Sequence, residues 1–247
     1  VATLAVETAV ETEAAMVVAT VDRAAAARVA LVAGATGLVG QAVLAALLAD
    51  KTYSAVHCVG RRKLSLQHPK LVQHVVDFQA PSGLKALPHV DDCFIALGTT
   101  IKVAGSQAAF RAVDFEAVVT VARAALAQGA TKLGVVSAMG ADASSAIFYN
   151  RVKGEMEQAL QDMAFKTLVI ARPSMLAGNR EALNQPSRAG ERIGLALTQL
   201  LKPVIPANYR SIAAEDVARA LTRTVKTAGT GTYRLLSGEM QGAAARH

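Results

Sequence analysis

Short apolar runs alternate with longer stretches of helical periodicity along most of the chain, from Arg28 onward. Several runs are almost continuous in Val, Ile and Leu, which is typical of strands buried on both faces of a sheet. The runs predict six strands, at Val29–Ala33, Ala55–Val59, Val72–Val76, Cys93–Leu97, Leu133–Ser137 and Thr167–Ala171. The stretches between them predict helices at Leu38–Ala49, Gln107–Gln128 and Tyr149–Met163. This alternation indicates βαβ units, and therefore an α/β fold of Rossmann type, with a doubly wound parallel sheet of six or seven strands.

The alternation becomes less regular after Pro173. Residues 176–190 are rich in Gly, Asn, Pro and Ser, which favour loops. Helices are expected at Glu191–Leu201 and Glu215–Lys226, and a turn over 227–232 leads to a last strand at Tyr233–Leu236. We expect this part to form a small C-terminal substrate-side region. The chain then divides into an N-terminal extension over 1–27, helical or flexible, one domain over 28–240 and a tail over 241–247.

The composition excludes several classes of protein. Of the 247 residues, 52% are hydrophobic and 18% are charged, so the chain has enough apolar side chain to exclude global disorder. Cys58 and Cys93 are too few for a disulfide scaffold, and the first strand would separate their strands, so we expect buried free thiols. No run of about 18 uncharged apolar residues predicts a transmembrane helix. Three Glu precede any Lys or Arg, unlike in a secretion signal, and we expect a reducing, cytoplasmic setting.

The chain is basic, with a formal net charge of +7 and a pI near 9.6. Its Lys and Arg residues are scattered, and the one basic run is 61–63. Aromatic residues make up 4% of the chain, so little material exists for stacking on bases. We therefore expect a solvated basic surface and no nucleic-acid partner. Five histidines show no spacing typical of metal ligands, and no metal site is expected: His57, His68, His74, His89 and His247.

A glycine motif follows the first predicted strand and opens the first predicted helix. It reads Gly34-Ala-Thr-Gly37-Leu-Val-Gly40. Glycine allows a tight turn and a close approach of the backbone to a pyrophosphate, and the free N–H groups of the helix N-terminus face that anion. A plain strand–helix turn is the alternative, but the position after the first buried strand favours a dinucleotide site.

The end of the second predicted strand indicates which dinucleotide binds. An Asp or Glu about 20 residues beyond the glycines usually holds a free ribose 2′-hydroxyl. Here the strand ends in Val59-Gly60-Arg61-Arg62, with no acid. A guanidinium matches a 2′-phosphate, which a carboxylate would repel, so the sequence predicts NADP(H) as cofactor. The alternative is that Arg61 and Arg62 are solvated turn residues.

Two further strand ends lie where a dinucleotide is expected. Asp77 and Phe78 end the third strand, where Asp77 would meet the adenine amine and Phe78 would flank the ring; a strand cap and a core aromatic are the alternative. The fourth strand ends at the topological switch point, where the cofactor of a doubly wound sheet lies. Its end contributes four expected cofactor contacts: Leu97, Gly98, Thr99 and Thr100.

A serine, a tyrosine and a lysine form a third group of candidate residues. Ser137 ends the fifth strand, and Tyr149 and Lys153 open the next helix at positions i and i+4, on one face. A phenol, with a pKa of about 10, is a poor acid–base at neutral pH, but a nearby ammonium favours the phenolate. Tyr149 would donate a proton to a carbonyl oxygen as hydride arrives, and Ser137 would hydrogen-bond that oxygen. Lys153 would also anchor the nicotinamide ribose.

Five stretches together resemble one known superfamily: Leu97-Gly-Thr-Thr-Ile-Lys-Val-Ala-Gly105, Phe110-Arg-Ala-Val-Asp114, Ser137-Ala-Met-Gly-Ala-Asp142, Phe148-Tyr-Asn-Arg-Val-Lys-Gly-Glu155 and Ala171-Arg-Pro173. They resemble the short-chain dehydrogenase/reductase superfamily over about 28–238, and within it the atypical branch that includes the Tat-interactive protein and bacterial NAD(P)-binding relatives. The resemblance implies that the pyrophosphate is held by Gly34, Thr36, Gly37 and Gly40, with Leu38 and Val39 closing the turn.

The same resemblance implies roles elsewhere in the chain. It implies a 2′-phosphate site at Arg61 and Arg62, a catalytic triad of Ser137, Tyr149 and Lys153, and a nicotinamide flanked by Pro173. Cofactor contacts are also implied for Tyr149 and Lys153. One position departs from the pattern, because many members place an Asn of a proton relay in the helix after the fourth strand. Here Asp114 occupies the comparable stretch.

These observations predict an NADP(H)-dependent oxidoreductase that interconverts a carbonyl and an alcohol on an unidentified small substrate, with Tyr149 as general acid–base. The alternative is a non-catalytic NADPH-binding regulatory protein that acts through protein partners, since some members of the atypical branch are dinucleotide-responsive regulators. Both a monomer and a homodimer remain open. The apolar segment Ile193–Ile205 would line a substrate pocket, form a dimer patch, touch a membrane surface or pack on the sheet edge.

Overall fold

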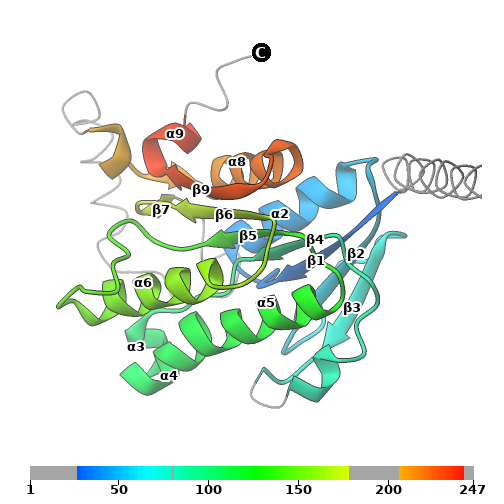
Figure 1. Cartoon of the computed structure of the whole chain (residues 1–247), viewed down its shortest axis with the longest axis horizontal. Coiled ribbons are helices and arrows are strands. Elements are labelled where there is room, and N and C mark those ends of the chain that lie inside the picture. Colours follow the sequence, from blue (N-terminus) through cyan, green and yellow to red (C-terminus); the bar gives the residue numbers. More distant parts are fainter. Residues whose placement is uncertain (1–26, 79–80, 178–205, 242–247) are drawn as a thin grey trace, which may run out of the picture.

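The centre of the protein is a parallel sheet of seven strands in the order β3-β2-β1-β4-β5-β6-β9 (Figure 1). The computed structural model describes residues 27–78, 81–177 and 206–241. The strands are β1 (Arg28–Ala33), β2 (Tyr53–Gly60), β3 (Leu71–Val75), β4 (Asp92–Ile95), β5 (Lys132–Val136), β6 (Thr167–Arg172) and β9 (Gly231–Leu236). The strand order reverses between β1 and β4, which creates the switch point at which such sheets bind ligands. The predicted Rossmann-type fold is confirmed.

Helices cover both faces of this sheet (Figure 1). One face is covered by α2 (Leu38–Ala49) and α8 (Ala214–Thr227), and the other by α5 (Val118–Ala127) and α6 (Phe148–Gln161). Successive residues of β1 enter different cores: Val32 packs in the core under α2 and α8, and Leu31 in the core under α5 and α6. Burial on both faces is the physical reason for the unbroken apolar runs in the strands.

The helix predicted over Gln107–Gln128 is wrong as a single regular element. The structure divides it into α4 (Gln107–Arg111), a π-helical turn η2 (Ala112–Ala117) and α5. A π-helical turn bonds residue i to residue i+5, which rotates the side chains that follow relative to an α-helix, and such turns are frequent at functional sites. In this one the Asp114 side chain is turned into the interior, where it is fully buried. A short helix that the sequence pattern did not predict, α3 (Ile101–Ala104), precedes α4.

The C-terminal part contributes both to the main sheet and to its carboxyl edge. β9 pairs with β6 from Gly231 onward, so the strand begins inside the turn predicted over 227–232. A second, two-stranded sheet of β7 (Leu176–Ala177) and β8 (Ile212–Ala213) lies in this part, with η4 (Ala207–Tyr209) and α9 (Ser237–Gln241). These short elements form the described portion of the expected substrate-side region.

Five predictions lie wholly or largely outside the described residues. They concern the extension over 1–26, the loop over 176–190 beyond β7, the helix Glu191–Leu201, the apolar segment Ile193–Ile205 and the tail over 242–247. Within the ranges that the structure describes, no helix is both long and apolar enough to cross a membrane. In the same ranges, no group of three or more His, Cys, Asp and Glu side chains is arranged to hold a metal ion.

The two cysteines lie in the cores on opposite faces of the sheet. Cys58 of β2 belongs to the core under α2 and α8, whereas Cys93 of β4 belongs to the opposite core, and β1 separates their strands. Burial raises the pKa of the Cys58 thiol to about 12 and raises the pKa of the Cys93 thiol as well. The predicted buried free thiols are confirmed, and both are unreactive at neutral pH.

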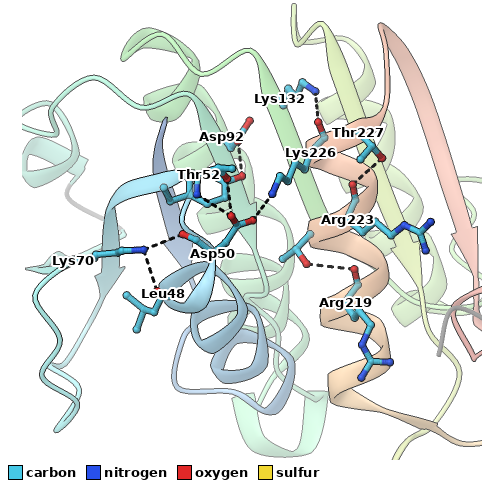
Figure 2. A network of polar contacts seen from close by, with 12 residues as sticks. Leu48, Asp50, Thr52, Lys70, Asp92, Lys132, Arg219, Arg223, Lys226 and Thr227 are labelled. Carbon is cyan, nitrogen blue, oxygen red and sulfur yellow. Dashed lines mark hydrogen bonds and ion pairs between the residues drawn. The ribbon is translucent and has the colours of Figure 1, made fainter. Parts of the chain in front are cut away.

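At the amino edge of the sheet, hydrogen bonds and an ion pair connect helices to strands (Figure 2). The carboxylate of Asp50, just after α2, accepts hydrogen bonds from the backbone N–H and the hydroxyl of Thr52 at 2.9 and 2.8 Å. Its second oxygen pairs with the Lys226 ammonium of α8 at 2.7 Å. Lys132 of β5 donates to the carbonyl oxygens of Lys226 and Ala228 at 3.2 and 3.0 Å. These bonds tie α8 to the segment between α2 and β2 and to the start of β5.

Replacing Lys226 by Met is expected to weaken the fold in a pH-dependent way. Although burial raises the pKa of Asp50, the bonds from Lys226 and Thr52 outweigh it and lower that pKa from 3.8 to about 2. A carboxyl with a lowered folded-state pKa stabilises the fold above its unfolded value and loses that contribution as the pH falls toward 2. Because the pair is partly exposed, we expect a loss of about 1 kcal/mol at pH 7.

Urea unfolding of the wild type and of Lys226→Met between pH 7 and pH 2 measures this effect. The difference in unfolding free energy should shrink as the pH falls through the range from 3.8 to about 2. Lys51→Met is the matched control, since it removes an exposed lysine next to Asp50. A difference that stayed constant with pH would assign the Lys226 effect to lost packing of its aliphatic stem.

Candidate functional site

The glycine motif forms a turn between β1 and α2 that admits no side chain at two of its positions. Gly34 has φ +90°, and a Cβ placed on it would lie 2.5 Å from the backbone of Ala96 at the end of β4. A Cβ on Gly40 would lie 2.0 Å from the carbonyl oxygen of Gly34. Both contacts are far below van der Waals distance, so these two glycines are required by the fold itself.

Gly37 is different, because no contact among the described residues requires a glycine there. It precedes α2 with φ −90° and ψ 165°, a conformation open to any residue, and the nearest heavy atom to a Cβ on Gly37 would be 3.5 Å away. Gly37 at the N-cap has no side chain that could accept from the first N–H groups of α2, and the first turn carries no acid. An anion seated on these N–H groups explains both the bare helix end and the missing side chain.

The remaining motif residues divide between solvent and core. Thr36 is exposed, Leu38 packs against the core, and Val39 is buried within it. Leu38 and Val39 therefore offer a ligand their backbone N–H groups and not their side chains. The motif as a whole presents main-chain donors at the switch point between β1 and β4, which fits a dinucleotide pyrophosphate.

The segment after β4 connects this turn to the interior of the site. Leu97 packs on the core under α5 and α6, whereas Gly98 is exposed. A Cβ on Gly98 would lie 3.4 Å from Asp114 Oδ1 and 3.9 Å from Lys153 Nζ. The Thr99 N–H donates to Asp114 Oδ2 at 2.8 Å, and the Thr100 hydroxyl caps α3 by accepting from the Val103 N–H at 3.2 Å.

Lys153 and Asp114 form an ion pair in the interior of the protein. Lys153 lies on α6 and Asp114 on the π-helical turn η2, with Nζ and Oδ1 2.7 Å apart and side chains that are 4% and 1% exposed. The Lys153 ammonium carries three protons, so pairing with Asp114 leaves others for a second acceptor, such as a ribose hydroxyl.

Tyr149 lies one helical turn before Lys153 on the same face of α6. Its ring packs against that of Phe110 of α4, with centroids 5.4 Å apart and planes inclined by 42°. The side chain is half-buried, and its hydroxyl makes no hydrogen bond to any residue that the structure describes. A ring fixed by packing and an uncommitted hydroxyl suit a group that hands a proton to a ligand.

Ser137 follows β5, is buried, and faces a different partner from the one expected. Its hydroxyl donates to Glu157 Oε1 at 2.5 Å, and Arg172 of β6 donates to both oxygens of the same carboxylate at 3.0 and 2.6 Å. Glu157 is buried on α6, one turn beyond Lys153. The Ser137 proton is thus committed to Glu157, and a bond from Ser137 to a substrate oxygen requires rotation of its side chain.

Glu157 and Arg172 are the residues that sequence reasoning missed. The sequence analysis gave no role to Arg172, which it quoted only within the stretch Ala171-Arg-Pro173. It did not consider Glu157. A signal for Glu157 existed, because it continues the i, i+4 series of Tyr149 and Lys153 along one face of α6. Its partner Arg172 was not visible, because Arg172 lies on β6 and meets α6 only in the folded chain.

The residues expected around the adenosine and the nicotinamide lie at the carboxyl edge. Arg61 and Arg62 are exposed directly after β2, and Asp77 is exposed after β3. Phe78 is half-buried and packs partly against the core under α5 and α6. Pro173 is buried after β6, where its carbonyl accepts from the Met139 N–H at 3.0 Å.

Comparison with known proteins decides the family. A family model described as NAD(P)H-binding matches residues 34–228, which is most of the chain. The chain belongs to this NAD(P)H-binding family. Protein HTATIP2 of Rattus norvegicus is 32% identical over 207 residues, covering 82% of this chain and 83% of its own. Protein FMP52, mitochondrial, of Eremothecium gossypii is 36% identical over 153 residues, covering 62% and 68%. Both place this NAD(P)H-binding protein in the atypical branch of the short-chain dehydrogenase/reductase superfamily, which confirms the predicted resemblance.

Solved structures support the fold of this short-chain dehydrogenase/reductase relative. An oxidoreductase of the short-chain dehydrogenase/reductase family from Burkholderia thailandensis superposes with a TM-score of 0.68 at 20% identity, covering 90% of this chain and 94% of its own. A superfamily protein from Agrobacterium tumefaciens with bound NAD superposes with a TM-score of 0.64 at 17% identity, covering 84% and 77%. At such identities the likeness concerns the fold alone.

The expected cytoplasmic setting is corrected by the comparisons. The FMP52 relatives from Eremothecium gossypii, Coccidioides immitis and further fungi are named mitochondrial proteins. The expectation was wrong because it was drawn from free thiols and from charge near the start of the chain. Free thiols exclude only an oxidising compartment, and they do not distinguish one reducing compartment from another.

Proposed function

We propose that the protein is an NADP(H)-dependent oxidoreductase that interconverts a carbonyl and an alcohol on a small substrate. The observation that carries the proposal is a series of close approaches along the carboxyl edge of the sheet. It runs from Gly34, which contacts the Ala96 backbone, through Gly98 to Lys153 beneath it. A dinucleotide with its pyrophosphate on α2 and its nicotinamide near Lys153 follows that path. The domain over 28–240 is proposed to act as one unit.

Each proposed catalytic residue has one task. A bound nicotinamide supplies or accepts the hydride. Tyr149 gives its phenolic proton to the carbonyl oxygen in reduction, or takes the alcohol proton in oxidation, as general acid–base. Lys153 holds the nicotinamide ribose through its free ammonium protons. Ser137 hydrogen-bonds the substrate oxygen after turning away from Glu157, and Pro173 flanks the nicotinamide.

The proposed cofactor contacts extend over the whole carboxyl edge. The pyrophosphate would be held by Gly34, Thr36, Gly37, Leu38, Val39 and Gly40. The segment after β4 would line the dinucleotide through Leu97, Gly98, Thr99 and Thr100. Asp77 and Phe78 would lie beside the adenine, and Arg61 and Arg62 would bind the 2′-phosphate, because two guanidinium groups with no adjacent acid favour a phosphate over a hydroxyl.

A specific variant tests the choice between NADP(H) and NAD(H). Each charge-assisted hydrogen bond to a phosphate contributes about 1.5–3 kcal/mol, so Arg61→Gln/Arg62→Gln is expected to weaken NADPH binding at least tenfold. NADH binding should change little. Because the chain contains no tryptophan, the fluorescence of the reduced nicotinamide is free of tryptophan emission. That fluorescence can therefore report the dissociation constants of both NADPH and NADH. Lys63→Gln removes the next exposed cation and serves as control. Equal affinity of the wild type for both cofactors would overturn the assignment.

The second candidate function is a non-catalytic NADPH-binding regulator that acts through protein partners. One observation favours it: the Ser137 hydroxyl donates to Glu157 and is not directed at a substrate oxygen in this arrangement. NADPH oxidation over a panel of aldehydes, ketones and quinones separates the two functions. Turnover that depends on substrate supports the oxidoreductase. NADPH binding without turnover on any class of carbonyl supports the regulator.

A further inference from the structure

Large apolar side chains are exposed at the carboxyl edge of the sheet, beside the proposed site. In the described part of the chain, ten large hydrophobic side chains are exposed. Six of them belong to segments at the carboxyl ends of β4, β5, β6 and β9 or to η4: Ile101, Val103, Ile147, Met175, Tyr209 and Leu236. A single exposed apolar residue is ordinary, whereas a group of them at one place marks a site of contact.

Three of these side chains follow three neighbouring strands and form what we call the apolar rim. Val103 lies on α3 after β4, Ile147 is the N-cap of α6 after β5, and Met175 follows β6. These strands are adjacent in the sheet, and Figure 1 shows α3, the start of α6 and β7 at the same end of it. Ile147 lies two residues before Tyr149, and Met175 two residues beyond Pro173. The rim thus borders the proposed substrate side of the site.

The backbone beneath the apolar rim is held by hydrogen bonds. The Val103 N–H donates to the hydroxyl that caps α3 at 3.2 Å. The Ile147 carbonyl accepts from the Arg151 N–H of α6 at 2.9 Å, and the Met175 carbonyl accepts from the Ile212 N–H of β8 at 3.0 Å. On this ordered backbone the three side chains are 65%, 62% and 54% exposed. Their contact with water is unfavourable, and a bound hydrocarbon would remove it.

The charges beside the apolar rim are used within the protein. Two ion pairs of α6, at 2.7 and 2.6 Å, neutralise its buried lysine and its buried glutamate. The Arg151 guanidinium donates to the carbonyls of Ser145 and Ala146 at 2.8 and 3.3 Å. Lys102 and Asp142 are exposed to solvent. Since each buried charge beside the rim has a partner among the described residues, the rim favours an uncharged ligand over a charged one.

We propose that the substrate is an uncharged carbonyl compound with a long hydrocarbon chain, and that this chain lies against the apolar rim. The inference deepens the proposed function and rests on it. In reduction, NADPH gives hydride to the carbonyl carbon, the electron pair of the C=O bond moves to oxygen, and that oxygen takes the Tyr149 proton, which solvent replaces. The products are the alcohol and NADP⁺. The chain is recognised through burial of apolar surface, which needs no directional partner.

Reduction of unbranched aldehydes from propanal to nonanal by NADPH tests the inference. Full burial of one methylene group corresponds to about fourfold in affinity, and a rim that covers one side of the chain should give about twofold. Over the added methylene groups of nonanal, kcat/KM is therefore expected to rise about 60-fold. Because the chain makes the same contacts in the ground state and in the transition state, the rise should appear in KM and not in kcat.

A variant without the apolar rim locates the effect. Val103→Ser/Ile147→Ser/Met175→Ser should lower the ratio of kcat/KM for nonanal to that for propanal at least tenfold. The fold should persist, because the three side chains are exposed and serine is favourable at the N-cap of α6. Val72→Ser is the matched control, since it removes an exposed valine from the edge strand β3, and it should keep the wild-type ratio.

A triple variant that kept the wild-type ratio would overturn the inference. If the same variant also changed the oligomeric state on gel filtration, the rim would be a contact between copies of the chain. Single replacement of Val103, Ile147 or Met175 by serine should each lower the ratio in part, which keeps the test decisive if the triple variant is unstable.

Binding of Nile red separates this inference from the proposed function. Nile red is an uncharged dye that fluoresces in apolar surroundings, and NADP⁺-saturated protein has no hydride to give to an aldehyde. Nonanal, and not propanal, should displace the dye from the wild type and from Val72→Ser, and the triple variant should bind it at least tenfold more weakly. This result without turnover on any aldehyde supports the apolar site and counts against the oxidoreductase. Turnover with equal kcat/KM for propanal and nonanal supports the oxidoreductase and overturns the inference.

Discussion

Tyr149→Phe is expected to lower the rate of NADPH-dependent carbonyl reduction by 10²- to 10⁴-fold, the usual contribution of a positioned general acid. The substitution removes the hydroxyl and leaves the ring, whose packing against Phe110 fixes its place on α6. Because the hydroxyl makes no hydrogen bond to a described residue, its loss leaves no partner unsatisfied in the fold. Cofactor affinity and thermal stability should therefore change little.

Steady-state kinetics and NADPH titration on the same preparations measure this prediction. Tyr233→Phe is the matched control, because Tyr233 lies on the edge strand β9 and is remote in sequence from the expected site. A control with wild-type kinetics would tie the effect to one phenol. Reduction that survives in Tyr149→Phe would mean that another group supplies the proton, and the mechanism proposed for this helix would be wrong.

Gly37→Ala should separate cofactor binding from folding. A Cβ on Gly37 meets no heavy atom closer than 3.5 Å, and the backbone there is open to any residue. Alanine is a poorer residue than glycine at a helix N-cap, so the expected cost to stability is below about 1 kcal/mol. The same methyl group would occupy the place where a pyrophosphate approaches the first N–H groups of α2. We expect NADPH affinity to fall at least tenfold, about 1.4 kcal/mol.

Gly105→Ala supplies the opposite pattern as a control. Gly105 ends α3 with φ +86°, and no heavy atom lies within 4 Å of a Cβ placed on it. Alanine in this left-handed conformation costs about 1–2 kcal/mol of stability, yet the position contributes nothing to the turn before α2. The pair should show lost affinity with retained stability at Gly37, and lost stability with retained affinity at Gly105. Unchanged NADPH affinity in Gly37→Ala would remove the pyrophosphate from this turn.

The local features of this protein were available from its sequence because they depend on neighbouring residues. The period of the apolar runs predicted each of the main strands to within two residues, and α2 was predicted at its observed bounds. The glycine turn could also be predicted from the sequence, since Gly34 and Gly40 are required by close backbone contacts in and next to the turn. Tyr149 and Lys153 were found because a helix brings positions i and i+4 to one face.

The tertiary structure alone decided which charges meet at the site. Asp114 was noted as a departure at one position, but its burial depends on the π-helical turn, which the helical pattern over Gln107–Gln128 did not signal. Its pairing with Lys153 joins two helices across the core, and the bond of Ser137 to Glu157 joins a strand end to the interior of a helix.

The sequence by itself thus determined the fold, the family and the place of the cofactor turn, because these follow from periodicity and from backbone sterics over a few residues. It did not determine the state of the catalytic groups. That state depends on which side chains lie within a few ångströms after the strands pair in their final order. Coulombic and hydrogen-bond interactions act over such short distances, and the spacing of residues in the sequence does not tell which side chains come that close.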